Sequence, residues 1–86
     1  MIRAKDVKPL KNYLILVRFV NDEERVFNCH PLITDDKLFS KLMDPNYFNK
    51  VHIDEMGIVC WDEATDINPY YLYEESQAVS GFSFAS

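Results

Sequence analysis

The sequence YLILVRFV, which occupies residues 13–20, decides the fold class of this chain. Its odd-numbered positions are Tyr, Ile, Val and Phe, and its even-numbered positions are also apolar apart from Arg18. β-Branched and aromatic residues favour strands, and successive side chains point to opposite faces of a strand. Because both faces are apolar, the stretch predicts a strand in the interior of a sheet.

The segments before and after this strand predict an antiparallel meander. Residues 2–9 mix β-branched with charged residues and end at Pro9. This suits an exposed edge strand, where the missing amide of a proline costs little. Residues 25–29 follow the polar sequence Asn21-Asp22-Glu23-Glu24 and alternate enough to form the returning arm of a hairpin. We therefore expect a three-stranded meander.

The spacing of apolar residues changes after His30-Pro31. It becomes that of one face of an amphipathic helix. Thr34 is the predicted N-cap, and Asp35-Asp36 would lie in the first turn, where the helix dipole favours negative charge. Asp44-Pro45 prevents the helix from continuing unchanged, and a further turn is expected over residues 45–49. The apolar positions of the predicted helix are Leu38, Phe39, Leu42 and Met43.

A second hairpin and a short helix are predicted towards the C-terminus. Residues 51–54 and 58–61 are short apolar stretches separated by a turn that contains Gly57, and glycine adopts the positive φ that a tight reversal usually needs. Asn68-Pro69 places a capping side chain directly before a first-turn proline. A helix from Pro69 to about Glu75 is therefore expected.

Together these elements predict an α+β fold: a small antiparallel β meander plus a second β hairpin, with one central amphipathic helix and a short C-terminal helix. A chain of 86 residues has room for one domain, which we expect to span residues 1–75. Residues 76–86 would form a C-terminal tail that is flexible or adds a strand. Phe82 and Phe84 alternate with serines, a pattern that suits pairing with a sheet edge, including that of a second copy in a homodimer.

Composition restricts the class of partner. The chain has 9 basic and 14 acidic residues and a net charge of −5, which repels a phosphate backbone, so we expect no direct binding of nucleic acid and favour a basic protein partner. The N-terminus lacks the apolar region of a secretory signal, and the longest apolar run, residues 13–17, is far short of a membrane span. A cytoplasmic protein that does not contact membranes is expected.

No residue pattern predicts catalysis, so we expect no enzyme, no cofactor and no metal site. Cys29 and His30 are adjacent in a strand and would point to opposite faces, so they cannot act together as nucleophile and base. His52 could approach Cys60 across the second hairpin, which would supply only half of a metal site. The cysteine spacing indicates neither a disulfide framework nor a zinc motif, and two reduced, mostly buried thiols are expected.

Aromatic and acidic residues gather in the sequence after the second hairpin. Tyr and Trp offer large contact areas with a polar group, and rings rimmed by carboxylates suit a basic partner. Alternatives remain open: Trp61 could be a core residue, and Asp66 could accept backbone amides of the following turn. Tyr70 is the tyrosine that we most expect to be exposed. The candidate interaction surface comprises Trp61, Asp62, Glu63, Asp66, Tyr70 and Tyr71.

The order of these motifs resembles the uncharacterised bacterial family known as domain of unknown function 2442, over residues 2 to about 75. Two positions depart from the family pattern: the first hairpin has Asn21-Asp22 where Asn-Gly is frequent, and Asn28 stands where an aspartate is usual. The matching motifs are Val7-Lys8-Pro9-Leu10, Leu14-Ile15-Leu16-Val17-Arg18-Phe19, Arg25-Val26-Phe27, Pro31-Leu32, Leu38-Phe39, Leu42, Asp44-Pro45, Phe48, Val51, Trp61, Asp66-Ile67-Asn68-Pro69 and Leu72-Tyr73.

The resemblance implies a small domain with two β layers and helical connections, and it implies no enzymatic activity. Some members of the family are found beside small toxin-like proteins and are regarded as candidate antitoxins, while others carry a helix-turn-helix domain downstream. Residues 76–86 are too few for such a DNA reader. We expect a small acidic protein-binding module, antitoxin-like towards a small basic toxin-like protein. The alternatives are a homodimeric structural or scaffolding protein and a small-molecule-binding domain with its site at a dimer interface.

Overall fold

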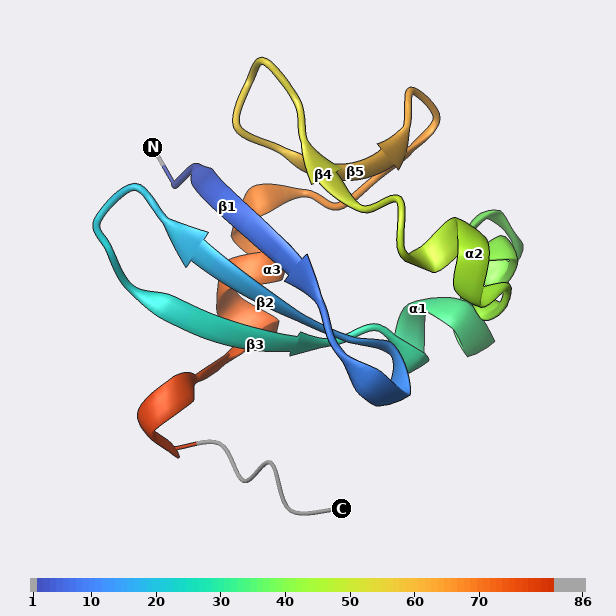
Figure 1. Cartoon of the computed structure of the whole chain (residues 1–86), viewed down its shortest axis with the longest axis horizontal. Coiled ribbons are helices and arrows are strands. Elements are labelled where there is room, and N and C mark those ends of the chain that lie inside the picture. The colour runs from blue at the N-terminus through green and yellow to red at the C-terminus, as the bar shows by residue number, and fades with distance from the viewer. Residues whose placement is uncertain (1, 82–86) are drawn as a thin grey trace.

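The computed structural model describes residues 2–81 and contains two antiparallel sheets (Figure 1). The first sheet has four strands in the order β1-β2-β3-β7. Its β1-β2-β3 part is the predicted meander, with β2 in the interior as its two-sided apolarity indicated. The α+β fold class is therefore confirmed. The four strands are β1 (Ala4–Pro9), β2 (Leu14–Phe19), β3 (Glu24–Asn28) and β7 (Gln77–Ala78).

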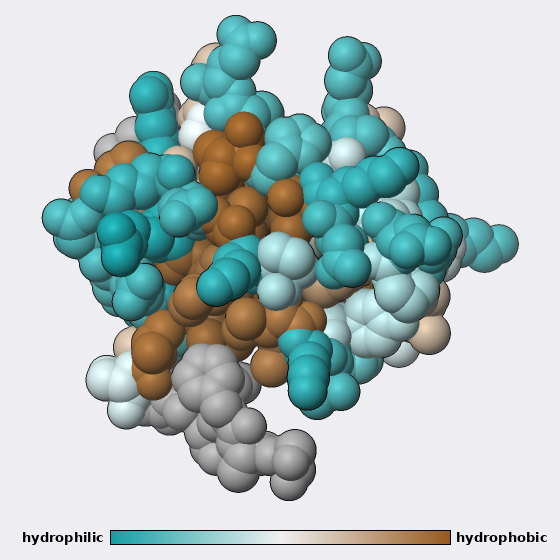
Figure 2. Space-filling model, viewed as in Figure 1, coloured by the Kyte–Doolittle hydropathy of each residue, from teal (hydrophilic) through white to brown (hydrophobic). Residues whose placement is uncertain are grey.

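The two faces of the meander have different environments. Ile15, which pairs with Phe27, shares the core face with Val17, and all three side chains are buried. Leu14 and Leu16 lie on the outer face, where they are half-buried and stand apart from the main core cluster of the described residues. Figure 2 shows hydrophobic residues gathered over the middle of the meander, with hydrophilic residues around them.

The connection between β1 and β2 includes Tyr13, which the sequence pattern places in the strand. Asn12 and Tyr13, in the 3₁₀ turn η1 (Lys11–Tyr13), have φ values of 61° and 60°. A large side chain rarely adopts positive φ, so tertiary contacts must hold Tyr13 there. Its hydroxyl donates to the Met43 carbonyl at 2.7 Å, and its ring packs edge-on against Phe48. The strand therefore begins at Leu14 rather than at Tyr13.

The second sheet lies above the meander in Figure 1 and has the order β4-β5-β6. The predicted hairpin forms between β4 (His52–Ile53) and β5 (Val59–Asp62), and Gly57 in its turn has φ +80°. The third strand, β6 (Thr65–Asp66), was not predicted, because two residues are too few to show an alternating pattern.

The predicted central helix is divided into two short helices, α1 (His30–Asp35) and the 3₁₀ helix η2 (Lys37–Met43). The further turn expected over residues 45–49 is the short helix α2 (Pro45–Phe48). Thr34 as N-cap is wrong: it lies within α1, where its Oγ1 donates to the His30 carbonyl at 3.2 Å. The helix starts earlier because Pro31 suits a first turn, and Asp36 is the cap of η2, accepting from the Leu38 amide at 2.9 Å.

The C-terminal helix α3 (Pro69–Glu75) has the predicted bounds and cap. The Asn68 Oδ1 accepts from the amides of Tyr70 and Tyr71 at 2.9 and 3.3 Å. Leu72 is buried, so the helix is anchored on the core face of the meander. The 3₁₀ turn η3 (Val79–Gly81) follows β7.

The C-terminal segment is joined to β3 by a network of polar contacts. Arg25 donates to the side chain and the carbonyl of Ser76, both at 2.7 Å, and to Glu23 at 2.6 Å. The Tyr73 ring lies 4.5 Å from the Arg25 guanidinium carbon. Of the two alternatives for the tail, Gln77–Ala78 form an added strand; Phe82 and Phe84 lie outside the described residues.

The main core lies between the meander, the second sheet and the helices. Large side chains come together there from all three parts, including Phe19, Phe48, Trp61 and Leu72. None of the helices within residues 2–81 has the length and apolarity that a membrane span requires.

Candidate functional site

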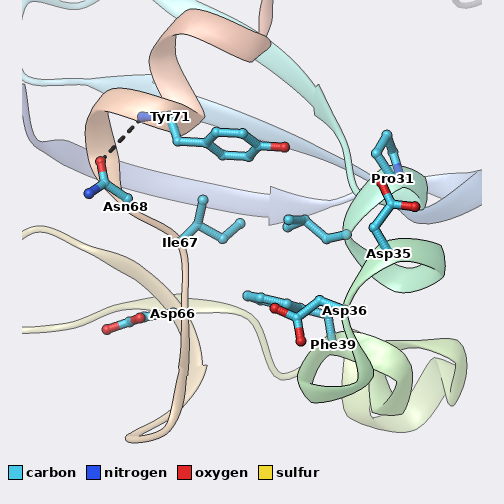
Figure 3. Close-up of a pocket in the computed structure, with 9 residues that line it drawn as sticks. Pro31, Asp35, Asp36, Phe39, Asp66, Ile67, Asn68 and Tyr71 are labelled. Atoms are coloured by element: carbon cyan, nitrogen blue, oxygen red, sulfur yellow. Dashed lines mark hydrogen bonds between the residues drawn. The ribbon is translucent and has the colours of Figure 1, made fainter.

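A groove of about 400 Å³ runs between the α1–η2 region and the segment that joins β6 to α3 (Figure 3). We call it the acidic groove. Its two sides come from parts of the chain about thirty residues apart, so only the tertiary fold forms it. The lining residues are Pro31, Leu32, Asp35, Asp36, Phe39, Asp66, Ile67, Asn68 and Tyr71.

Local hydrogen bonds hold the two sides of the groove. On one side, the Asp36 carboxylate caps η2 and so places the Asp35-Asp36 pair at the junction of two helices. On the other side, the Ile67 amide donates to the Val59 carbonyl at 3.0 Å, and Asn68 caps α3. Tyr71, in the first turn of that helix, packs edge-on against Phe27 with ring centroids 6.0 Å apart.

The groove combines an apolar floor with an acidic rim. Ile67 and Phe39 are buried beneath it, while Tyr71 is 41% exposed. Asp35, Asp36 and Asp66 are all exposed. Figure 3 shows the first two on one side of the groove and Asp66 at the opposite edge, with its carboxylate pointing away from the other two. None of the described residues that line the groove is basic. Such a surface suits a positively charged group on an aliphatic stem, because stem and charge each find a matching environment.

The predicted interaction surface is only partly brought together. Tyr71 and Asp66 line the groove, and Tyr70, on the same helix, is 52% exposed as expected. Trp61 is only 3% exposed and lies in the core, where its Nε1 donates to the Phe48 carbonyl at 2.9 Å. The prediction that Trp61 belongs to the interaction surface is therefore wrong, and the alternative of a core residue is correct.

Asp62 is held in a network of its own rather than in the groove. The Tyr47 hydroxyl donates to its carboxylate, Lys41 Nζ lies 3.1 Å from it, and the Ala64 amide donates at 2.9 Å. The Tyr47 hydrogen bond, followed by that of Lys41, keeps the pKa of Asp62 well below its usual value. This carboxylate joins β5 to α2 and η2, so its charge is already compensated.

Glu63 and Asp66 line a second cavity, of about 310 Å³, on the outer side of the second sheet. Asp66 thus stands between this cavity and the acidic groove. The amides at the start of α3 bond to Asn68 and not to Asp66. The Asp66 side chain is exposed, which leaves its charge available to a partner.

The sequence pattern missed the α1–η2 side of the groove. Asp35 and Asp36 were interpreted as favourable charges in the first turn of a helix, whereas they lie where α1 ends and η2 begins. Phe39 was correctly expected to pack inward, but a helical period cannot show which groove its buried side chain underlies. The adjacent pair of aspartates was the one signal available.

The two cysteines are free and differ in their surroundings. Cys29 is fully buried in the main core, and burial raises the pKa of its thiol to about 12. Cys60 lies across the second hairpin from His52, as predicted, with Sγ 3.4 Å from Nε2. Within residues 2–81, no group of three or more His, Cys, Asp or Glu side chains is arranged to hold a metal ion.

Fold and groove define a small α+β domain with an acidic, partly aromatic groove on its surface. The chain belongs to the family described as "Protein of unknown function (DUF2442)", which matches residues 4–78. A similar fold occurs in the crystal structure of a "Putative DNA Binding Protein" from Nitrosomonas europaea, with a TM-score of 0.71 and 20% identity. The similarity covers 84% of this chain and 48% of that one, so this chain spans about half its length. No curated protein matches the sequence.

Proposed function

We propose that this chain is a protein-binding module whose acidic groove receives a basic segment of a partner, as an antitoxin-like protein would receive a small basic toxin-like protein. The observation that carries the proposal is the groove itself: its lining combines three exposed carboxylate residues with an apolar floor and an exposed tyrosine. The proposed role is non-enzymatic and cytoplasmic.

The chemistry of the groove favours a lysine or arginine side chain over other ligands. Aliphatic stems gain from contact with the half-buried Leu32 and the exposed Tyr71. The cationic end gains from the carboxylates of Asp35, Asp36 and Asp66. A cation over the face of an exposed tyrosine contributes about 0.5–1 kcal/mol more. Several such contacts along one basic segment would give specificity, because each requires both a charge and an apolar stem.

Direct binding of DNA is less well supported by the charges. The name of the Nitrosomonas europaea protein concerns a chain about twice as long, and 20% identity shows a common fold alone. The net charge of −5 opposes contact with a phosphate backbone, and so do the carboxylates of the groove. Any transcriptional role would then act through a bound protein.

The test compares two double charge reversals. The groove variant is Asp35→Lys with Asp66→Lys, and the control is Glu55→Lys with Glu74→Lys, which makes the same change of charge at exposed sites outside the groove. The ligands are a fluorescent hexa-arginine peptide and any stoichiometric partner captured from native extract. The groove variant replaces two attractive charge contacts by repulsive ones, so its affinity for these ligands should fall on the order of 100-fold.

The control variant is expected to weaken binding only about threefold, through long-range charge alone. Equal loss in both variants would mean that net charge and not the groove attracts the ligand. Unchanged affinity in the groove variant would place the binding surface elsewhere.

A second candidate, self-association, is favoured by the outer face of the meander. Leu14 and Leu16 are only half-buried there and do not pack against the main core cluster of the described residues. Apolar residues on an exposed sheet face commonly mark an interface. Light scattering at micromolar concentration tests this candidate: a dimer mass that falls to the monomer mass in Leu16→Lys supports it, and a monomeric native chain rejects it.

A further inference from the structure

A thiol, an imidazole and a carboxylate stand in a row on the outer side of the second sheet. Cys60 in β5 is paired with His52 in β4 and with Asp66 in β6. Its neighbours Val59 and Trp61 belong to the main core cluster, whereas Cys60 does not, so its side chain points to the opposite face. The Sγ atom lies 3.4 Å from His52 Nε2, within hydrogen-bond distance for sulfur.

The imidazole of His52 is oriented to accept a proton from this thiol. Its Nδ1 lies 2.9 Å from the Lys50 carbonyl oxygen. Because a carbonyl oxygen can only accept, Nδ1 carries the proton of the neutral ring and Nε2 is left as the acceptor facing Sγ. A nucleophile beside a base that a third group orients is the arrangement used in thiol chemistry.

The cavity in front of the thiol is small and negatively charged. It has a volume of about 310 Å³ and is lined, beside His52 and Cys60, by four carboxylate residues: Asp54, Asp62, Glu63 and Asp66. Cys60 is only 5% exposed and lines this cavity, so a reagent that reaches the residue must fit into the cavity. The carboxylate of Asp62 is paired with Lys41, and those of Asp54, Glu63 and Asp66 repel anions and attract cations.

We propose that Cys60 is a site of thiol–disulfide exchange, with His52 as its base, that accepts small cationic disulfides. The Cys60 sulfur attacks one sulfur of R–S–S–R while the thiol proton passes to His52 Nε2. The disulfide bond of the reagent breaks, and its electron pair leaves on the second sulfur. This thiolate takes the proton from Nε2 and departs as R–SH, so that one new disulfide replaces the old one.

The need for a base follows from the surroundings of the thiol. Burial, followed by the charges of Asp54, Asp66 and Asp62, raises the pKa of Cys60, so the free thiolate is disfavoured without a proton acceptor at hand. Cys29 provides a natural contrast in the same chain. It is fully buried in the main core and lines neither the acidic groove nor the cavity beside His52.

The experiment uses the reduced full chain and three small disulfides of different charge. They are cystamine, a dication; bis(2-hydroxyethyl) disulfide, which is neutral; and dithiodiglycolate, a dianion. Peptide mass spectrometry measures the rate of adduct formation at each cysteine. We expect a single adduct, at Cys60, which forms fastest with the dication, more slowly with the neutral disulfide and slowest with the dianion. Each step in this series should change the rate about fivefold per charge contact, and the differences should shrink as salt is added.

Variants separate chemistry from packing. His52→Gln should slow the reaction of Cys60 about tenfold or more. The rate with the dication divided by the rate with the dianion should decrease in the double variant Glu63→Gln with Asp66→Asn, which neutralises two carboxylates of the cavity. It should not change in the control Glu74→Gln with Glu75→Gln, because neither residue lines the cavity. In every variant Cys29 must stay unmodified, which reports that the domain is folded. Reaction at Cys29 as fast as at Cys60 in the native chain, no adduct at Cys60, or no preference for the dication would each overturn the proposal.

Discussion

The substitution Trp61→Phe tests the corrected placement of the single tryptophan. It removes the indole N–H that donates to the Phe48 carbonyl at 2.9 Å, and that carbonyl keeps only the Val51 amide, at 3.3 Å. The lost buried hydrogen bond costs about 1 kcal/mol. The smaller ring leaves a void in a site that is 97% buried, which costs about 1 kcal/mol more. The free energy of unfolding should thus fall by about 2 kcal/mol.

Thermal unfolding followed by circular dichroism measures the effect without relying on tryptophan fluorescence. A loss of about 2 kcal/mol lowers the Tm of a domain of this size by roughly 10 °C. Tyr70→Phe is the matched control, since its ring is 52% exposed and its change should stay within about 0.5 kcal/mol. In the native chain, the fluorescence of Trp61 should also resist quenching by acrylamide. Equal small Tm changes in both variants, or efficient quenching, would refute a core role for Trp61.

Three further predictions concern the turns and the acid range. Asn68→Ala should lower the Tm by about 5 °C through the lost cap, whereas Asn68→Asp keeps an acceptor and should not; equal losses would contradict capping. Gly57→Ala should cost about 1–2 kcal/mol in urea unfolding, because φ is +80° and its Cβ would lie 3.0 Å from Arg3 Cβ; an unchanged midpoint would reject this. Because the pKa of Asp62 is lower in the folded chain than its ordinary value of 3.8, ionisation of Asp62 stabilises the fold at pH values above 3.8. This stabilisation is lost as the pH falls from 3.8 through the pKa of the folded chain. Below about pH 4 the native chain should therefore lose more stability than the Tyr47→Phe variant, which lacks the hydrogen bond to Asp62. Urea midpoints that fall by the same amount in both chains as the pH is lowered would show that this hydrogen bond contributes nothing.

Features set by neighbouring residues were predictable from the sequence. The apolar residues on both faces of the 13–20 stretch indicated an interior strand, and Asn68-Pro69 indicated the start of α3. The turn at Gly57 followed from the conformational freedom of glycine, and the approach of His52 to Cys60 followed from the hairpin register. In each case a local preference and the tertiary fold favour the same structure.

Other features depended on contacts between distant segments. The amphipathic pattern around Phe39 was real, but the capping of η2 by Asp36 divided the helix, because a side-chain cap competed with continuation of α1. Strand β6 exists only because Thr65–Asp66 find a partner in β5. A pattern of apolar residues gives no information on such competition.

By itself, the sequence determined the fold class, the negative charge and the absence of a recognisable catalytic motif, since these depend on composition and on residues close together in the chain. The tertiary structure alone decided that Trp61 is buried, that Asp62 is paired with Tyr47 and Lys41, and that Asp35 and Asp66 line the same groove. The physical reason is that tertiary packing brings together side chains about thirty positions apart in the sequence. Whether a charged group is paired or free to contact a ligand depends on those distant neighbours.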